Sequence, residues 1–284
     1  MKIPKRLQPL IDEGLIDDVL SRLMSGKEAD VYVVRCNNEI RCAKIYKEAA
    51  KRGFKQAAVY QEGRKTRNSR RARAMGKNSK FGRAQQEKTW HNAEVDALFK
   101  LAKAGVRVPQ PYACIDGVLL MELITDAEGE VAPRLSDVSM SAEQAVEDHS
   151  CVMADVVRML CAGIVHGDLS EFNILVDDYG PIIIDLPQAI DAAANNNAEK
   201  FLIRDVNKIR SYYGQFAPEL LRSQYAKEIW KLYEDGDLQP DSVLSGVFAD
   251  STDSADVDGI MLEINSAIAE EFERQARKQE AEEG

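Results

Sequence analysis

Residues 166–175 read HGDLSEFNIL, and residues 182–185 read IIID. The first stretch places a carboxylate, Asp168, five residues before an amide, Asn173, and the second stretch ends on another carboxylate, Asp185. Apolar residues on both sides of an Asp-Asp-Tyr-Gly-Pro turn predict a short hairpin between the two stretches. That hairpin would bring the three polar side chains together.

This set of side chains suits phosphoryl transfer, which needs a proton acceptor for the attacking hydroxyl and oxygen ligands for Mg²⁺. Asp168 could accept the proton, while Asn173 and Asp185 could hold Mg²⁺ together with phosphate oxygens and water. An isolated aspartate is more often a cap or a turn residue, but three polar residues at this spacing favour a kinase-like site. We interpret His166 as a packed residue that orients the loop, with an acid–base role as the alternative.

The first half of the chain has the pattern of antiparallel strands. An Asn-Asn turn separates strand-like residues 31–34 from residues 40–46, and an Asp-Gly turn separates residues 112–115 from residues 118–124. Residues 6–24 have mostly helical spacing, although their second half could equally be a strand.

The second half of the chain has mainly helical periodicity. A capping-box pattern begins at Ser141. Hydrophobic spacing predicts helices at about residues 87–104, 141–161, 199–213, 216–233 and 257–280.

A lysine and a glutamate stand among apolar residues in the first half. Lys44 lies in a predicted strand, and Glu94 lies on the apolar face of the predicted helix that follows. An unpaired carboxylate would be costly to bury there, so we expect an ion pair between them across a cleft. Lys44 is similar to the strand lysine that binds nucleotide phosphates in kinases. The alternative, a lysine at a strand edge, is weakened by the partner that Glu94 offers.

The segment SGKE at residues 25–28 is a weaker signal for phosphate binding. Gly26 is the only glycine between Ser21 and Arg35, so neither GxGxxG nor a P-loop is present. Ser25 and Lys27 could still offer a hydroxyl and an ammonium to phosphates. A solvated turn lysine is an equally good interpretation of Lys27.

Charge is distributed unevenly along the chain. Lys51 to Arg83 contains twelve basic residues and one acidic residue, whereas residues 250–284 contain eleven acidic and three basic residues, within a net charge of −10. The basic segment could attract nucleic acid, an anionic protein surface or the acidic tail. A solvated mobile loop is the alternative.

Bulk composition predicts a globular, cytoplasmic protein. The 284 residues are 45% hydrophobic, which is enough for a core. Five cysteines without a CxxC pair favour neither a disulfide framework nor a zinc site. No signal peptide and no apolar run of a spanning helix is visible, so we expect no membrane partner.

Together, these residues resemble the RIO-type atypical serine/threonine protein kinases, in the subfamily marked by a Gly-Lys-Glu-Ala loop. The resemblance covers roughly residues 6–235 and rests on Gly26-Lys27-Glu28-Ala29, Val31-Tyr32, Lys44, Glu94, Met121-Glu122, residues 166–175 and Asp185. It implies an α+β, bilobal protein-kinase-like fold within a domain at residues 1–235. An antiparallel-sheet N-lobe (about 15–123) would precede a mainly helical, shortened C-lobe (about 125–235) and an acidic extension (236–284).

The resemblance also implies roles for individual residues. Met121 would be the gatekeeper, Glu122 and Ile124 would contact adenine through their backbone, and Asp168 would accept the proton. Asp185 would ligate the metal with Asn173 and is also implicated as a phosphoryl acceptor. The implied nucleotide-binding residues are Ser25, Lys27, Lys44, Glu94, Met121, Glu122 and Ile124.

The implied activity is that of a self-phosphorylating serine/threonine kinase, an ATPase, or both, with ATP and Mg²⁺ as cofactors and Mn²⁺ as an alternative metal. Its partners would be a protein substrate or the chain itself, with Ser69 and Ser79 as self-phosphorylation sites. RNA or a ribosomal particle could be a further partner, bound through the flexible basic loop at about residues 51–83. The alternatives are a small-molecule phosphotransferase of the aminoglycoside or choline kinase type and an ATP-gated RNA- or ribosome-binding switch.

The sequence departs from kinase patterns at three places. Leu-Pro-Gln follows Asp185 in place of Phe-Gly, and Met24-Ser25 replaces the Ser-Thr common in the family. Ala217-Pro218-Glu219 resembles the APE motif, but we interpret it as the start of a C-terminal helix. Neither an ordinary activation segment nor an ordinary peptide-binding lower lobe is therefore expected.

Overall fold

The computed structural model describes residues 3–26, 29–47 and 93–248. Lys27, the basic segment 51–83 with Ser69 and Ser79, and the predicted helix 257–280 lie outside these ranges. No helix within them is long and apolar enough to cross a membrane.

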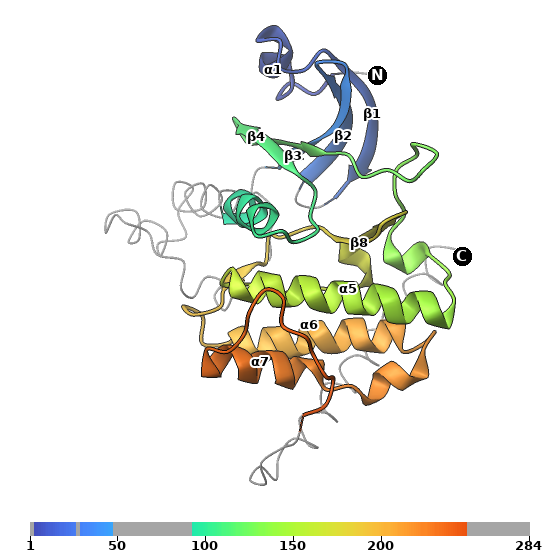
Figure 1. The fold of residues 1–284 in the computed structure, drawn as a ribbon. Helices are drawn as coiled ribbons and strands as arrows, with labels where there is room; N and C mark the ends of the chain where they lie inside the picture. The colour runs from blue at the N-terminus through green and yellow to red at the C-terminus, as the bar shows by residue number, and fades with distance from the viewer. Residues whose placement is uncertain (1–2, 27–28, 48–92, 249–284) are drawn as a thin grey trace, which may run out of the picture. The chain divides into compact units, whose positions relative to one another are not determined.

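The N-terminal part is a five-stranded antiparallel sheet (Figure 1). The strand order is β1-β2-β3-β5-β4, and the strands are β1 (Asp18–Ser25), β2 (Ala29–Cys36), β3 (Glu39–Tyr46), β4 (Pro111–Ile115) and β5 (Val118–Glu122). Both predicted tight turns are present, with positive φ at Asn37 and Asn38 and at Asp116 and Gly117. Such angles suit two-residue hairpin turns because they match the twist of the flanking strands.

Residues 6–24 contain both of the structures considered for them. Helix α1 (Gln8–Asp12) is short, and the chain then enters β1. The second half of residues 6–24 is therefore a strand.

The two faces of the sheet pack against different helices. On β3, Ala43 and Ile45 belong to a core cluster with Leu7 and Leu10 of the α1 region. Tyr46 belongs to a larger cluster that includes Leu98 from the helix described over residues 93–103. Side chains alternate along a strand, so Lys44 shares the face of Tyr46 and is directed toward that helix.

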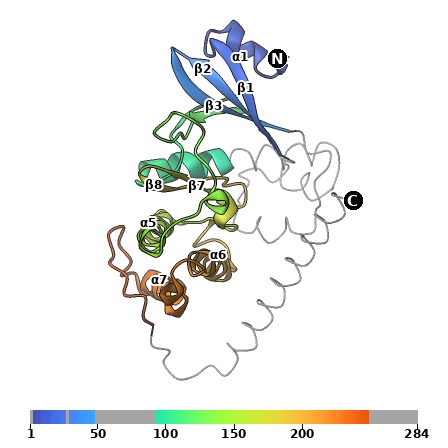
Figure 2. The ribbon, with the colours of Figure 1, turned by 90° about the vertical axis from the view of Figure 1, so that its right-hand side faces the viewer.

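The C-terminal part is mainly helical. Helices α5, α6 and α7 pack against one another, and the helix at 93–103 lies between the sheet and α5 (Figures 1 and 2). The elements are η1 (Leu135–Asp137), α5 (Ala142–Cys161), β6 (Ile164–Val165), η2 (Glu171–Asn173), β7 (Ile174–Asp177), β8 (Gly180–Ile183), β9 (Ile190–Asp191), α6 (Ala198–Tyr213), η3 (Pro218–Arg222) and α7 (Tyr225–Asp235).

Two local predictions in this part are confirmed. The hairpin exists as β7 and β8, with Ile174 opposite Ile183. The hydroxyl of Ser141 accepts a hydrogen bond of 3.2 Å from the backbone N–H of Gln144, which caps α5.

One predicted helix is wrong. Residues 216–233 do not form a single helix, because the 3₁₀ segment η3 occupies Pro218–Arg222 and α7 begins only at Tyr225. Pro218 fixes φ and lacks an N–H, which favours a new start over continuation of a helix. Ala217-Pro218-Glu219 therefore opens a 3₁₀ turn, and the whole arrangement is an α+β, bilobal protein-kinase-like fold.

Candidate active site

Lys44 connects three elements that are distant in sequence. Its Nζ donates hydrogen bonds of 2.6 Å to Glu94 Oε1 and 2.9 Å to Asp185 Oδ1. The side chains of Lys44 and Glu94 are only 13% and 8% exposed. The expected ion pair is therefore present, and Asp185, which follows β8, joins it.

The charges of this network stabilise one another. Burial disfavours the Lys44 ammonium, but the carboxylates of Glu94 and Asp185 outweigh it and raise the lysine pKa well above its usual value. Partial loss of solvent disfavours the Asp185 carboxylate, whose side chain is still 47% exposed, but the neighbouring Lys44 outweighs this effect and lowers the pKa of that carboxyl group. Both groups are thus held charged at neutral pH.

The backbone around Asp185 is held in an uncommon conformation. Its φ of 63° is in the left-handed region, which aspartate tolerates better than most residues. The N–H of Ile184 donates to the carbonyl of Asn173 over 3.0 Å, and the carbonyl of Ile184 lies 3.1 Å from His166 Nε2. These bonds fix the residue before Asp185 to the loop that carries Asp168.

His166 organises this loop from a buried position, with 3% of its surface exposed. Its Nδ1 accepts the backbone N–H of Asp168 over 3.3 Å, so Nε2 must carry the hydrogen that is donated to Ile184. Both ring nitrogens are therefore used within the protein, which supports the orienting interpretation of His166.

Asn173, a predicted metal ligand, contacts Asp168 through its side-chain nitrogen. Its Nδ2 donates to the Asp168 carbonyl over 2.8 Å, so the side-chain oxygen is the atom left for coordination. Within the described ranges, no group of three or more His, Cys, Asp or Glu residues could hold a metal. A metal at Asn173 and Asp185 therefore needs phosphate oxygens and water, as Mg²⁺ readily accepts.

Asp205, which the sequence analysis missed, anchors the same loop from α6. Its Oδ2 accepts the N–H of Gly167 over 2.8 Å, and Arg204, which also donates to the Gly167 carbonyl, pairs with its Oδ1 at 3.2 Å. Burial raises the pKa of Asp205. Glu94 was identified as a carboxylate on an apolar helical face. Asp205 has the same signal, because it lies between Leu202 and Ile209 on the apolar face of α6, and it could have been found in the same way.

Two more residues contact Asp168 and were also missed. Gln188 Nε2 lies 3.2 Å from Asp168 Oδ2, and Lys208 Nζ lies 3.2 Å from Asp168 Oδ1. No local pattern points to them, since Lys208 is 40 residues away in sequence.

The residues expected to contact adenine are Glu122, the last residue of β5, and Ile124, two residues further on. The Glu122 N–H donates to Gln110 over 2.9 Å, and the Ile124 carbonyl accepts from Ala132 over 3.0 Å. An adenine bound here would therefore have to use the Glu122 carbonyl and the Ile124 N–H. Met121, at the end of β5, is partly buried and packs against the larger core cluster.

The turn between β1 and β2 is closed by a bond of 2.9 Å from the Gly26 N–H to the Ala29 carbonyl. Lys47 braces it, with Nζ 3.1 Å from the Ser25 hydroxyl, 2.7 Å from the Gly26 carbonyl and 3.0 Å from Asp30 Oδ1. Ser25 is thus already part of a polar network, while its predicted companion Lys27 lies outside the described residues.

Comparison with known proteins identifies the family of this chain. The family model for the RIO domain matches residues 30–226. The chain belongs to the RIO family. The matched range contains every predicted site residue except Ser25 and Lys27.

Several RIO relatives carry kinase names. The chain is 33% identical over 205 residues to the RIO-type serine/threonine-protein kinase Rio1 of Haloferax volcanii, covering 72% of this chain and 66% of that protein. It is 31% identical to the human serine/threonine-protein kinase RIO1, covering 72% of this chain and 34% of that protein. It is 29% identical to the probable serine/threonine-protein kinase RIO1 homolog of Encephalitozoon cuniculi, covering 76% of this chain and 58% of that protein. The chain thus spans between one third and two thirds of the length of these RIO relatives.

Proposed function

We propose that this RIO protein transfers the γ-phosphoryl group of ATP, with Mg²⁺ or alternatively Mn²⁺, to a serine or threonine hydroxyl or to water. The observation that carries the proposal is Lys44 bonded to both Glu94 and Asp185 beside the loop in which Asn173 is bonded to Asp168. A structural ion pair alone would need neither the second carboxylate, Asp185, nor a neighbouring loop that carries an amide and a third carboxylate.

Each residue has a distinct part in this proposal. Mg-ATP supplies the phosphoryl group and a metal that offsets phosphate charge. Asp185 and Asn173 offer hard oxygen ligands for that metal, and the Lys44 ammonium offsets further phosphate charge. Glu94 fixes the position of Lys44.

The Asp168 carboxylate is the acceptor of the hydroxyl proton. The bond from the acceptor oxygen to phosphorus forms while the bond to the ADP oxygen breaks, and the proton of the acceptor passes to Asp168. In phosphoryl transfer, positioning and electrostatic stabilisation together account for almost all of the rate enhancement. The Asp168 backbone meets the requirement for positioning, because its N–H donates to His166 and its carbonyl accepts from Asn173.

The acceptor is proposed to be a protein, either another chain or this one, and the proposed self-phosphorylation sites are Ser69 and Ser79. The twelve basic residues between Lys51 and Arg83 make RNA or a ribosomal particle a further proposed partner. A cytoplasmic location stays a prediction from the cysteine content.

The test is incubation with γ-labelled ATP and Mg²⁺, followed by measurement of labelled protein and released phosphate. We expect both signals in the wild type and a loss of about 100-fold or more in Asp168→Ala, because a positioned base contributes about 10²- to 10⁴-fold. Peptide mapping under mild and acidic conditions distinguishes phosphoserine from an acyl phosphate on Asp185. A wild type that yields neither signal, or an Asp168→Ala variant as active as the wild type, would refute this assignment.

A further inference from the structure

Every polar atom of Asp168 has a partner in this structure. The backbone N–H donates to His166, and the backbone carbonyl accepts from Asn173. The two carboxylate oxygens each accept one hydrogen bond of 3.2 Å, Oδ1 from Lys208 and Oδ2 from Gln188. The backbone contacts lie within the loop itself, whereas the side-chain contacts come from outside it.

Lys208 reaches Asp168 because of its place on α6. It lies three residues after Asp205, so both side chains project from the same side of the helix. Asp205 binds the Gly167 N–H, and one turn later Lys208 binds the side chain of the next residue, Asp168. One helical face therefore holds both the backbone and the carboxylate of the loop.

Gln188 reaches Asp168 from the segment that follows Asp185. The backbone before Asp185 is bonded to His166, so this segment starts from a fixed point. Gln188 thereby ties the orientation of the proton acceptor to the strand end that carries the proposed metal ligand.

These two contacts restrict Asp168 without blocking it. A carboxylate oxygen can accept about two hydrogen bonds, so each oxygen retains room for an incoming hydroxyl. The Lys208 ammonium also places a positive charge beside the group that receives the proton. During transfer, negative charge develops on the attacking hydroxyl oxygen as it loses its proton. A cation that is already in place nearby stabilises that charge.

A purely structural ion pair is the competing explanation. The Lys208 and Asp168 side chains are 32% and 40% exposed. Pairs at this exposure contribute little to folding stability. A structural role therefore predicts almost no consequence when Lys208 is replaced, and a role in the reaction predicts a large one.

We propose that Lys208 and Gln188 are positioning residues for Asp168, which hold its carboxylate in the orientation needed to accept the proton of the attacking hydroxyl. The proposal rests on the phosphoryl transfer proposed above. Of the two contacts with the Asp168 carboxylate, that of Lys208 should be the stronger, because Lys208 contributes a full charge as well as a hydrogen bond.

The experiment measures phosphate transfer at saturating and at limiting Mg-ATP for the wild type, Lys208→Met, Lys208→Arg and Gln188→Ala. We expect Lys208→Met to lower kcat by about 10- to 100-fold and to leave KM for ATP within about twofold, because misorientation of a reacting group affects turnover more than nucleotide binding. Lys208→Arg, which keeps the charge, should recover most of kcat. Gln188→Ala should lower kcat by a smaller factor.

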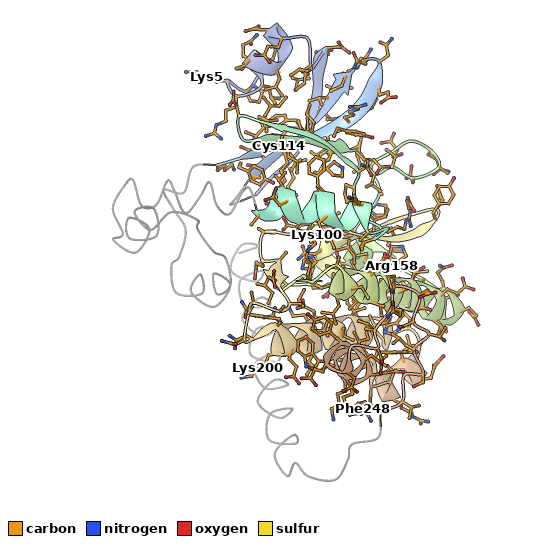
Figure 3. The ribbon with its side chains drawn as sticks, turned by 60° about the vertical axis from the view of Figure 1, so that its left-hand side comes forward. Lys5, Lys100, Cys114, Arg158, Lys200 and Phe248 are labelled. Atoms are coloured by element: carbon orange, nitrogen blue, oxygen red, sulfur yellow. The ribbon has the colours of Figure 1, made fainter. Side chains whose placement is uncertain are left out.

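The matched control is Lys200→Ala, which removes an exposed lysine at the N-terminal end of the same helix (Figure 3). It should behave as the wild type. Thermal unfolding of all variants should stay close to that of the wild type, so a loss of kcat would not reflect a loss of folded protein.

A double-mutant comparison decides whether Lys208 acts through Asp168. In an Asp168→Ala background, Lys208→Met should cause no further loss of the residual single-turnover rate. An active wild type with an unaffected Lys208→Met, or an equal loss in both backgrounds, would overturn the positioning role and leave the proposed function intact. An inactive wild type would instead overturn the proposed function, and the positioning role with it.

Discussion

Lys44 combines a structural role with a proposed chemical role in one side chain. Its bond to Glu94 neutralises a buried carboxylate, and its bond to Asp185 reaches the proposed metal ligand. Removing one partner of a buried ion pair is much more costly than removing both, because the remaining charge stays buried without compensation. This asymmetry allows the two roles to be separated.

Lys44→Met should therefore lower both stability and turnover. We expect a loss of about 3 kcal/mol in the free energy of unfolding, measured with urea, since Glu94 would remain buried without a cation beside it. The double variant Lys44→Met with Glu94→Gln should regain much of that stability but none of the phosphate release. If the double variant is no more stable than Lys44→Met, the stability role assigned to this pair is wrong.

At the scale of elements, α5, α6 and α7 meet around a buried histidine. His149 of α5 is 1% exposed, and its ring lies 5.8 Å from that of Tyr213 and 5.4 Å from that of Tyr225. Among the described residues, His149 Nε2 has no hydrogen-bond partner. Burial, with a smaller effect from Arg210, lowers the pKa of His149 from 6.5 to about 4. The packing of these helices therefore requires a neutral imidazole.

This pKa makes the helical part sensitive to mild acid. A folded-state pKa below the unfolded value means that the stability is fully present above pH 6.5 and is lost as the pH falls toward 4. Between pH 8 and pH 5 the loss from this one group is about 2 kcal/mol. The variant His149→Phe keeps an aromatic ring but cannot be protonated. Its free energy of unfolding, measured with urea, should therefore fall between pH 8 and pH 5 by about 2 kcal/mol less than that of the wild type. Equal pH dependence in both proteins would show that His149 is already solvated or protonated.

Sequence was a good guide to elements whose signals are local. The hairpin turns at Asn37-Asn38 and Asp116-Gly117 and the cap at Ser141 depend on a few adjacent residues, and all were predicted. The pairing of β6 with β9 and the break before α7 were missed. Two-residue strands carry no periodicity, and a proline that starts a 3₁₀ turn resembles one that starts a helix.

The candidate site shows the same limit. Lys44, Glu94, Asp168, Asn173 and Asp185 could be selected from short motifs. Lys208 and Gln188 could not, because only the packing of α6 against the loop and the path of the chain after Asp185 bring them to Asp168.

At the scale of residues 3–247, the sheet and the helical part share both a core and a site. The larger core cluster includes Leu119 of β5 and Val156 of α5, and the bond between Lys44 and Asp185 connects the same two parts. A ligand that contacts groups from both parts binds only when these parts are folded together. Its binding energy should therefore appear as stability of the whole region.

Mg-ATP should accordingly raise the melting temperature, and removal of the metal should reverse part of that rise. At a free nucleotide concentration about 100 times Kd, the expected gain is about 2.7 kcal/mol, which corresponds to several degrees. EDTA should reduce the shift in the wild type. In Asn173→Ala, which lacks the amide oxygen, the shift should already be small and EDTA should change it little, whereas Lys200→Ala should match the wild type. A full, EDTA-sensitive shift in Asn173→Ala would remove Asn173 from the metal site, and a shift of equal size with AMP would place the binding energy in the adenine contacts instead of the phosphates.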